Sequence, residues 1–487
     1  MKSVAMTGSV DLGLVKGTEQ SVRSPALAVD LDGTLVKTNL LLESVLALLR
    51  EKPQYLFVLL VWLLKGKAYF KGQVASRVSL DVEVLPYQID FLDYLKAQRA
   101  EGRFMVLATA GDMKLAQQVA DHLKLFDLIL ASDGTTNLSG GCKRDRLVSE
   151  FGEKGFDYAG NCHHDLAVWS SARNAVVVNA SPLVSSKVER VTRIDRIFKD
   201  PRKGFANYLR ALRPHHWLKN LLVFVPLLAA HRLDEITLVG KALLAFVAFS
   251  CFASGGYLLN DLFDLSSDRH HPLKRLRSLA SGDLSISYAV GMIPVLVALG
   301  CIAGAMVSPV FLAVACTYFG LNIAYSWYAR QVVLLDVMVL AGLYALRIMG
   351  GSVAAAIRPS SWLLAFSMFS FFSLALVKRY SELAMNHVKA RSYEMVDQEF
   401  LASMGIASGY VSILVLALYI NTATAQMLYP RHGLIWLLCP LLLYWISHIW
   451  LSAHRGRMLE DPVVFAASDR TSRILIILMV ATIAGAL

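Results

Sequence analysis

The sequence predicts a chain of two parts, a water-soluble α/β domain followed by an all-α membrane bundle. Three observations lead to this prediction. The 487 residues are 55% hydrophobic and 17% charged, a composition more apolar than that of an average soluble protein. The apolar residues are unevenly distributed, because long apolar runs repeat only after about residue 215. Before that point, short apolar runs end in acidic, polar or glycine residues, as the strands of a parallel sheet do.

The predicted boundaries divide the chain into four segments. They are an N-terminal tail at 1–25, the α/β domain at 26–195 with a helical cap at about 40–95, a basic interfacial linker at 196–215, and a transmembrane domain at 216–487. The first 25 residues lack a basic start followed by an apolar core of about 7 to 15 residues, so they predict no secretory signal. We therefore expect the α/β domain in the cytoplasm and the bundle in the inner (plasma) membrane, which it crosses several times.

The net charge of +11 indicates which kind of molecule the protein binds. Ten cations and only three acidic residues lie between Lys187 and Lys219, beside the first apolar run of the bundle. Cations beside membrane spans favour anionic lipids and phosphorylated substrates, so we expect membrane lipids as partners and no nucleic acid. The six cysteines show no metal-ligand spacing and are expected to be reduced or buried thiols.

Four short motifs stand out in the α/β domain. The strand-like run Ala26–Val29 ends in Asp30, Asp32 and Gly33, and the glycine permits a tight turn. Parallel sheets present carboxylates at their carboxyl edge in this way. Later motifs supply further polar residues, namely Thr109, Lys143, Asn161 and Asp165.

These motifs, in this order, resemble those of the haloacid-dehalogenase-like phosphohydrolases. The resemblance implies a Rossmann-like fold with a helical cap and a phosphatase site. It implies that Asp30 attacks a phosphoryl group and that Asp32 acts as acid and base. It assigns phosphate binding to Thr109 and Lys143, and Mg²⁺ binding to Asp30, Asp32, Asn161 and Asp165. The family usually has aspartate at the position of Asn161, so a non-catalytic scaffold or regulatory domain is the alternative.

An apolar helical segment at 54–64 lies inside the predicted cap and has two interpretations. It is shorter than the roughly 20 residues that a membrane span requires, and Lys65, Lys67 and Lys71 follow it. One interpretation is a cap helix pressed on the bilayer surface, with its lysines near lipid phosphates. The other is a buried helix of the cap.

The bundle is predicted to contain about nine spans. They lie near 219–231, 241–262, 286–305, 308–328, 332–356, 361–380, 407–428, 433–451 and 472–487. With the N-terminal domain inside, the loops on its side contain thirteen Lys and Arg residues and the opposite loops contain four. This asymmetry satisfies the positive-inside rule and places every candidate residue of the bundle on one side.

The central feature of the bundle is the acidic end of its second predicted span. Asn260, Asp264 and Asp268 are spaced i, i+4 and i+8, so on a continuous helix they share a face, with Asp261 beside them. Hard oxygen ligands packed this closely suit Mg²⁺ shared with substrate phosphates. The alternative is a polar helix end followed by a solvated basic loop.

This acidic motif, the basic residues that follow it and a closing Ser281-Gly282 resemble the first signature of the UbiA-type membrane prenyltransferase superfamily. Within it, the decaprenyl-phosphate phosphoribosyltransferase branch is most similar. That branch resemblance also rests on Leu212–Asn220, on His454–Met458 and on Asp461–Val463. It implies that Asp261 and Asp264 are catalytic and that Asn260, Asp261, Asp264 and Asp268 hold Mg²⁺.

The remaining candidates are predicted to bind substrate. They are Lys219, Lys274, Arg275, Arg277, Tyr325, Asp336, Lys378, Arg379 and Arg457. Aromatic prenyltransferases of the superfamily usually carry a second aspartate-rich motif after the sixth span, and this chain instead carries Lys378, Arg379, Lys389 and Arg391 there. Fixed cations bind phosphate directly, which favours substrates with an additional phosphate.

The resulting hypothesis is Mg²⁺-dependent transfer of phosphoribose from phosphoribosyl diphosphate to a polyprenyl phosphate, as in cell-wall biosynthesis. The α/β domain would then remove the ribose 5-phosphate from the lipid product. One alternative is a prenyltransferase that uses prenyl diphosphate with an aromatic or lipid acceptor, beside a non-catalytic α/β domain. Another is a membrane transporter or lipid-binding protein, for which inverted repeats would be expected.

Overall fold

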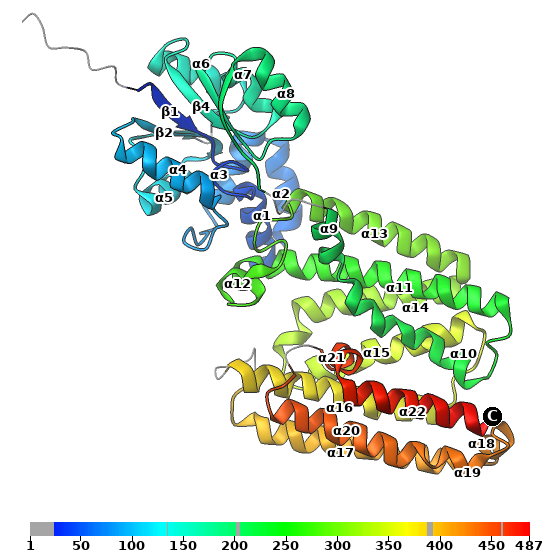
Figure 1. Ribbon diagram of the computed structural model, residues 1–487. Helices are drawn as coiled ribbons and strands as arrows, with labels where there is room; N and C mark the ends of the chain where they lie inside the picture. The colour runs from blue at the N-terminus through cyan, green and yellow to red at the C-terminus, as the bar shows by residue number, and fades with distance from the viewer. Residues whose placement is uncertain (1–23, 134, 201–204, 387–392, 459–460) are drawn as a thin grey trace, which may run out of the picture. The chain divides into compact units, whose positions relative to one another are not determined.

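The computed structural model describes most of the chain (Figure 1). The described residues are 24–133, 135–200, 205–386, 393–458 and 461–487. The chain folds into two compact units, one formed by Met1–Ser44 with Gln54–Asp200 and the other by Val45–Pro53 with Pro201–Leu487. The first is an α/β unit and the second is an all-α unit.

The α/β unit is built on one parallel sheet of six strands. The strands are β1 (Ala26–Val29), β2 (Met105–Asp112), β3 (Leu128–Ser132), β4 (Phe156–Gly160), β5 (Asn174–Val178) and β6 (Arg193–Phe198). Their order is β3-β2-β1-β4-β5-β6, and every neighbouring pair is parallel. The strand order reverses between β1 and β4, the place where doubly wound sheets usually bind ligands. This arrangement confirms the predicted α/β class for the unit.

The two faces of the sheet pack into separate cores. Leu27 and Val29 of β1 lie in one core, and Ala26 and Ala28 lie in the other, because successive strand residues point to opposite faces. Helices α4 (Ile89–Ala100) and α5 (Met113–Leu123) contribute to the first core. The second core receives α6 (Gly141–Phe151), α7 (Leu166–Trp169) and α8 (Pro182–Val191).

The segment between β1 and β2 carries additional helices. They are α1 (Leu40–Glu51), α2 (Tyr55–Leu64), α3 (Lys67–Ala75) and the already described α4. Phe91 and Leu95 of α4 are fully buried in the same core as Leu27, so α4 belongs to the covering layer of the sheet. The helical insertion outside that layer therefore consists of α1 to α3.

The all-α unit contains long helices joined by short ones. The long helices are α11 (Ile236–Phe263), α13 (Ile286–Val307), α14 (Pro309–Trp327), α15 (Leu335–Ala354), α16 (Ser361–Asn386), α17 (Asp397–Ile420), α20 (Leu438–His454) and α22 (Arg470–Ala486). The short helices are α9 (Phe205–Leu212), α10 (Val225–Ala229), α12 (Leu265–His270), α18 (Ala423–Leu428), α19 (His432–Ile435) and α21 (Pro462–Ser468). Three 3-10 segments complete it, η2 (Pro214–Phe224), η3 (Lys274–Leu276) and η4 (Ala329–Gln331).

Among the described residues, seven helical stretches are long and apolar enough to cross a membrane. They correspond to seven of the nine predicted spans, so the count of nine is not confirmed. The first predicted span, 219–231, forms the end of η2 and the five-residue helix α10. The last forms α22, whose 17 residues extend about 25 Å and fall short of a hydrocarbon core of about 30 Å.

Close packing places η2 against α15. A Cβ added at Gly351 of α15 would lie 2.0 Å from the carbonyl oxygen of Val223, so only glycine allows this approach. The contact brings the buried residues Lys219 and Asn220 of η2 beside α15. The segment that was predicted to span the membrane thus places buried residues in the interior of the all-α unit.

Candidate functional sites

The acidic cluster lies where α11 ends and α12 begins. Asp264 lies between the two helices with φ −91° and ψ 5°, but helical hydrogen bonding continues through it. Its backbone N–H donates to the carbonyl of Asn260 at 2.9 Å, and the N–H of Asp268 donates to the carbonyl of Asp264 at 2.7 Å. The helix turns therefore keep Asn260, Asp264 and Asp268 in succession along one side, as the spacing predicts.

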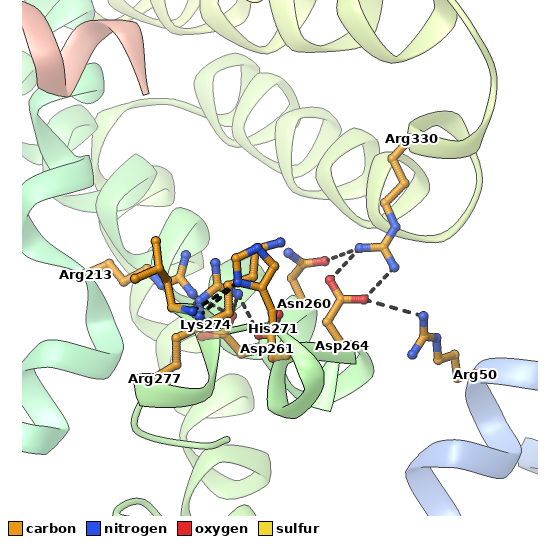
Figure 2. A network of polar contacts seen from close by, with 11 residues as sticks. Arg50, Arg213, Asn260, Asp261, Asp264, His271, Lys274, Arg277 and Arg330 are labelled. Carbon is orange, nitrogen blue, oxygen red and sulfur yellow. Dashed lines mark hydrogen bonds and ion pairs between the residues drawn. The ribbon is translucent and has the colours of Figure 1, made fainter. Parts of the chain in front are cut away.

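Arginine side chains divide this cluster into two groups (Figure 2). In the first group, Arg330 donates to both carboxylate oxygens of Asp264 at 2.7 Å and to Oδ1 of Asn260 at 3.0 Å. Such a bidentate pair is among the strongest charge-assisted contacts in proteins. Arg330 belongs to η4, so this group fixes the end of α11 to the segment that precedes α15.

The second group is formed by Asp261 and Asp268, which are seven residues apart and so lie two turns apart on one face. Arg213 donates to the two oxygens of Asp261 at 2.6 and 2.8 Å. Arg277 donates to Asp268 at 2.6 Å and to Asp261 at 3.3 Å. Burial raises the pKa of Asp268 above its ordinary value, whereas Arg277 acts to lower it.

These four residues fit a divalent cation in their chemistry, although arginines engage all of them. Carboxylate and amide oxygens are ligands that Mg²⁺ prefers. Within the described ranges, no group of three His, Cys, Asp or Glu side chains is arranged to hold a metal ion. An arginine must therefore release an oxygen before that oxygen can coordinate a cation. The predicted basic residues Lys274 and Arg275 lie on the adjoining segment η3, where Arg275 is exposed.

A second buried network joins α15 to α16. The guanidinium of Arg379 donates to Asp336, Glu382 and the hydroxyl of Tyr325. The hydroxyl of Tyr393 donates to Asp336 at 2.6 Å. Arg379 is 1% exposed and Asp336 is fully buried, so these predicted residues contact each other deep in the unit.

A third network surrounds Asp461, which precedes α21. Lys219 donates to its Oδ2 at 2.6 Å, and Nζ of Lys378 lies 3.5 Å from the same oxygen. The hydroxyl of Tyr344 donates to Asp461 at 3.2 Å, and the N–H of Val463 donates at 3.2 Å. Burial opposes ionisation of Asp461, but Lys219 and Lys378 outweigh it and hold its pKa below the ordinary range.

Arg347 adds a further positive charge beside this network. Its guanidinium donates to Oδ1 of Asn220 at 2.8 Å and to the hydroxyl of Tyr318 at 2.7 Å. It lies over the ring of Tyr344 at 5.6 Å, and Nζ of Lys219 lies 5.7 Å from the same ring. Arg347 is 4% exposed and forms no salt bridge with a carboxylate in the part of the chain that the structure describes.

Aromatic side chains connect the acidic cluster to the Asp461 network. Arg213, which holds Asp261, lies over the ring of Tyr257 at 5.4 Å. The ring of His216 lies 5.0 Å from Tyr257, and η2 continues from His216 to Lys219. Arg213 itself has φ 54°, in the left-handed region that costs a non-glycine residue about 1 kcal/mol or more. The strained residue thus lies at the junction of the two networks.

The structure does not bring every predicted residue into these networks. Arg457 is exposed on the turn after α20. Lys389 and Arg391 lie outside the described residues.

The candidate phosphatase residues gather at the carboxyl ends of β1, β2 and β4. Nζ of Lys143 donates to Asp30 at 2.7 Å and to the hydroxyl of Tyr158 at 2.9 Å. Tyr158 in turn donates to Asp165 at 2.7 Å, and Asp165 accepts the backbone N–H of Asn161 at 3.0 Å. Burial raises the pKa of Asp30 to about 7, although Lys143 acts in the opposite direction.

The other residues of this group border the same edge. Asp32 accepts the N–H of Leu40 at 2.8 Å, and burial raises the pKa of Asp32. Thr109 is fully buried, and its hydroxyl accepts the N–H of Gly111 at 2.9 Å. Asn161 packs against Gly33, where an added Cβ would lie 2.1 Å from its side-chain nitrogen. The six residues predicted from the motifs therefore lie along one edge of the sheet.

Sequence reasoning assigned no site role to several residues that complete these sites. They are Lys71 and Tyr158 in the α/β unit, and Arg213, Arg330, Arg347 and Asp461 in the all-α unit. Lys71 donates to the carbonyl of Ala110 at 2.6 Å and borders a small pocket together with Asp32. Arg347 carried a usable signal, because an ionisable residue inside an apolar span is a functional candidate by default.

The geometry defines a class of protein, a multi-pass membrane protein with a buried acid–arginine cluster at a helix end and a separate α/β unit. Residues 221–483 match the model of the UbiA prenyltransferase family. Since the match covers more than half of the chain, the protein belongs to the UbiA prenyltransferase family. It is therefore a membrane enzyme, a prenyltransferase of the UbiA type.

The chain is also similar to individual proteins. The chain is 34% identical to the uncharacterised protein y4nM of Sinorhizobium fredii, over 92% of this chain and 89% of that protein. It is 28% identical to the decaprenyl-phosphate phosphoribosyltransferase of Mycobacterium tuberculosis, over 60% of this chain and 98% of that enzyme. Among solved structures, it is similar to a UbiA homologue from Archaeoglobus fulgidus bound to GPP and Mg²⁺. That similarity has a TM-score of 0.44 and 16% identity, over 57% of this chain and 99% of the other.

Proposed function

We propose that the all-α unit transfers phosphoribose from phosphoribosyl diphosphate to a polyprenyl phosphate. The observation that carries the proposal is the excess of positive charge around Asp461, where Lys219 and Arg347 are buried and Lys378 is partly exposed. Lys219, Lys378 and Arg347 supply three cations against one carboxylate. Buried charge requires compensation, and phosphate groups of the substrates would supply it. The similarity to an enzyme named for this transfer supports the same choice of substrates.

The acidic cluster would bind the diphosphate end of the donor. Asn260, Asp261, Asp264 and Asp268 would hold Mg²⁺, which when bound neutralises the charge of a diphosphate leaving group. Three arginines already contact these carboxylates: Arg213, Arg277 and Arg330. When an arginine releases its carboxylate, its guanidinium can donate to a phosphate oxygen of the substrate. The arginines would then balance the charge of the phosphates, and Mg²⁺ would balance the charge of the carboxylates, so the net charge of the cluster would stay small.

The reaction itself requires little covalent chemistry from the protein. The bond between the anomeric carbon and the diphosphate oxygen breaks, and diphosphate leaves with the electron pair. An oxygen of the polyprenyl phosphate forms the new bond to that carbon. Because this oxygen is already anionic, no general base is required, and positioning and charge stabilisation account for catalysis.

The three cations around Asp461 would position the acceptor and the ribose phosphate. Lys219 and Lys378 share Asp461, which holds both ammonium groups toward one point. Arg347 keeps a fixed orientation through Asn220 and Tyr318. Arg379 is paired with Asp336 and Glu382, so we assign Asp336 and Arg379 the role of joining α15 to α16 beside the site.

For the α/β unit we propose a phosphatase of the haloacid-dehalogenase type that removes the ribose 5-phosphate from the lipid product. Asp30 would be the nucleophile, since it lies at the switch point of the sheet and contacts Lys143. Asp32, Asn161 and Asp165 border Asp30 and would complete a Mg²⁺ site with it. Both units would work at the cytoplasmic face of the inner membrane.

The test is transfer of label into lipid. Membranes that contain the protein are incubated with phosphoribosyl diphosphate labelled in the ribose, Mg²⁺ and polyprenyl phosphate, and the lipids are then extracted. We expect label in the organic phase with wild type and none with Asp261→Asn or Asp264→Asn. The proposed substrates are wrong if the label stays in the aqueous phase. They are also wrong if the label enters lipid only when prenyl diphosphate replaces polyprenyl phosphate.

A further inference from the structure

Helix α2 of the α/β unit presents an unusually apolar surface. Its ten residues, Tyr55–Leu64, are all aromatic or aliphatic. Six large side chains on it are more than half exposed, from 52% to 88%: Leu56, Phe57, Leu60, Val61, Leu63 and Leu64. A buried cap helix would not leave these side chains in water, so the exposure favours the bilayer-surface interpretation of this segment.

The orientation of α2 is fixed by a small buried face. Leu59 and Trp62, three residues apart, are each 7% exposed. Arg77 lies over the ring of Trp62 at 4.7 Å, and the ring of Tyr55 lies 5.6 Å from it. Because this narrow face attaches α2 to its unit, the remaining apolar surface is directed outward as a rigid patch.

We propose that α2 docks on the bilayer, with its apolar surface in the headgroup region of anionic lipids. A helix of ten residues is about 15 Å long, which is too short to cross a hydrocarbon core of about 30 Å but sufficient to lie in its surface. Lys65 and Lys67 follow α2 and are exposed, so cations adjoin the apolar patch. The same chain continues into the all-α unit, whose described residues include seven helices long and apolar enough to cross a membrane, so a bilayer is within reach of the chain.

Docking would also bring the candidate phosphatase site close to lipid headgroups, a consequence that rests on the proposed function. Helix α3 follows α2 and carries Lys71. Lys71 donates to the carbonyl of Ala110 and, at 2.7 Å, to the side chain of Asn137. Only one helix therefore separates the apolar patch from the residues around Thr109.

The experiment is photo-crosslinking in the full-length protein. A benzoyl-phenylalanine replaces Phe57, which is 74% exposed, so the replacement removes little packing. The matched control is the same replacement at Phe104, which is 45% exposed and precedes β2 at the opposite edge of the sheet. Both proteins are irradiated in vesicles of phosphatidylcholine with or without phosphatidylglycerol, and adducts are identified by mass. We expect lipid adducts at position 57 and none at position 104.

A charge variant tests the anionic part of the proposal. Replacing Lys65 and Lys67 by Gln should lower the lipid adduct yield at position 57 in phosphatidylglycerol vesicles, by up to about fivefold for each lysine. The yield in phosphatidylcholine alone should stay unchanged. Adducts from position 57 to protein, either a second copy or another part of the same chain, would overturn the proposal, and so would equal lipid yields at positions 57 and 104. Lipid adducts form without any enzymatic turnover. The crosslinking result therefore tests docking even if the proposed transferase and phosphatase reactions prove wrong.

Discussion

At the scale of single residues, Asp461 connects two predicted candidates, Lys219 and Lys378, with a buried tyrosine. It accepts from Lys219, which lies 242 positions earlier in the chain, and from Tyr344, and it lies near Lys378. Without its charge, the buried ammonium group of Lys219 and the partly exposed one of Lys378 would lie close together without a carboxylate between them. The carboxylate therefore acts as a positioning residue for the cations that we assign to phosphate binding.

Replacing Asp461 by Asn should destabilise the protein by about 3–5 kcal/mol, because it leaves Lys219 buried without a counter-charge. Thermal unfolding in detergent measures this effect, with the exposed Asp234→Asn as control. Asp461→Glu should recover part of the stability and of kcat/KM for polyprenyl phosphate. If Asp461→Asn unfolds at the same temperature as Asp234→Asn, the assigned role of Asp461 is wrong.

The Asp336–Arg379 pair leads to a second prediction at this scale. Arg379→Gln should cost about 3–5 kcal/mol because it leaves Asp336 buried without a counter-charge, and Asp336→Asn should cost less because Glu382 still pairs with Arg379. The double variant should cost less than the sum of the two, by about 1–3 kcal/mol. A double-mutant cycle of unfolding free energies measures the coupling. Strict additivity would contradict the assigned structural role.

At the scale of elements, the turn after β1 depends on a single glycine. Gly33 has φ 77°, and Asn161 occupies the space where a Cβ would lie. Gly102 has nearly the same backbone conformation, φ 78°, but no atom lies within 4 Å of an added Cβ. Comparing alanine substitutions at Gly33 and Gly102 therefore distinguishes the cost of backbone strain, which both share, from the cost of a steric clash, which only Gly33 has.

Gly102→Ala should cost about 1–2 kcal/mol, the ordinary penalty of a left-handed conformation for alanine. Gly33→Ala should cost clearly more and should abolish phosphate release, because Asn161 must move. Thermal unfolding and phosphatase assays of the two variants provide the measurement. Equal effects of the two substitutions would show that Asn161 does not need its present position.

The elements also show how far sequence reasoning extends. The short apolar run Ala26–Val29 and the acidic residues after it predicted a strand and a site at its end, because both signals are local. The order of the long apolar helices was predicted for the same reason. The segment 219–231 is not confirmed as a span: its apolar composition fits a span, but the structure forms it as the end of η2 and the short helix α10, with Val223 packed against Gly351.

The contacts within the candidate sites were less predictable than their positions. Spacing correctly placed Asn260, Asp264 and Asp268 in succession, but nothing local indicates that Arg330 or Arg213 pairs with them. Similarly, the apolar segment Tyr55–Leu64 left two interpretations, since composition does not reveal which side chains a neighbouring helix covers. Partners distant in sequence require the fold itself.

At the scale of the whole molecule, the two units divide the proposed reaction into two steps. The all-α unit would form phosphoribosyl lipid, and the α/β unit would remove its phosphate. The residues assigned to the two proposed steps belong to different elements, Asp30 directly after β1 and Asp261 in α11. Substitution of Asp30 or of Asp261 should therefore abolish one of the two activities and leave the other activity intact.

One measurement tests the central claim directly, the fate of phosphoribosyl diphosphate that carries ¹⁴C in the ribose and ³²P in the 5-phosphate. We predict that wild type places ¹⁴C without ³²P in the extracted lipid, that Asp30→Asn places both labels there, and that Asp261→Asn places neither. Absence of ¹⁴C from the lipid with wild type would contradict the assigned transfer. Equal ³²P in the lipid of wild type and Asp30→Asn would contradict the assigned phosphatase step.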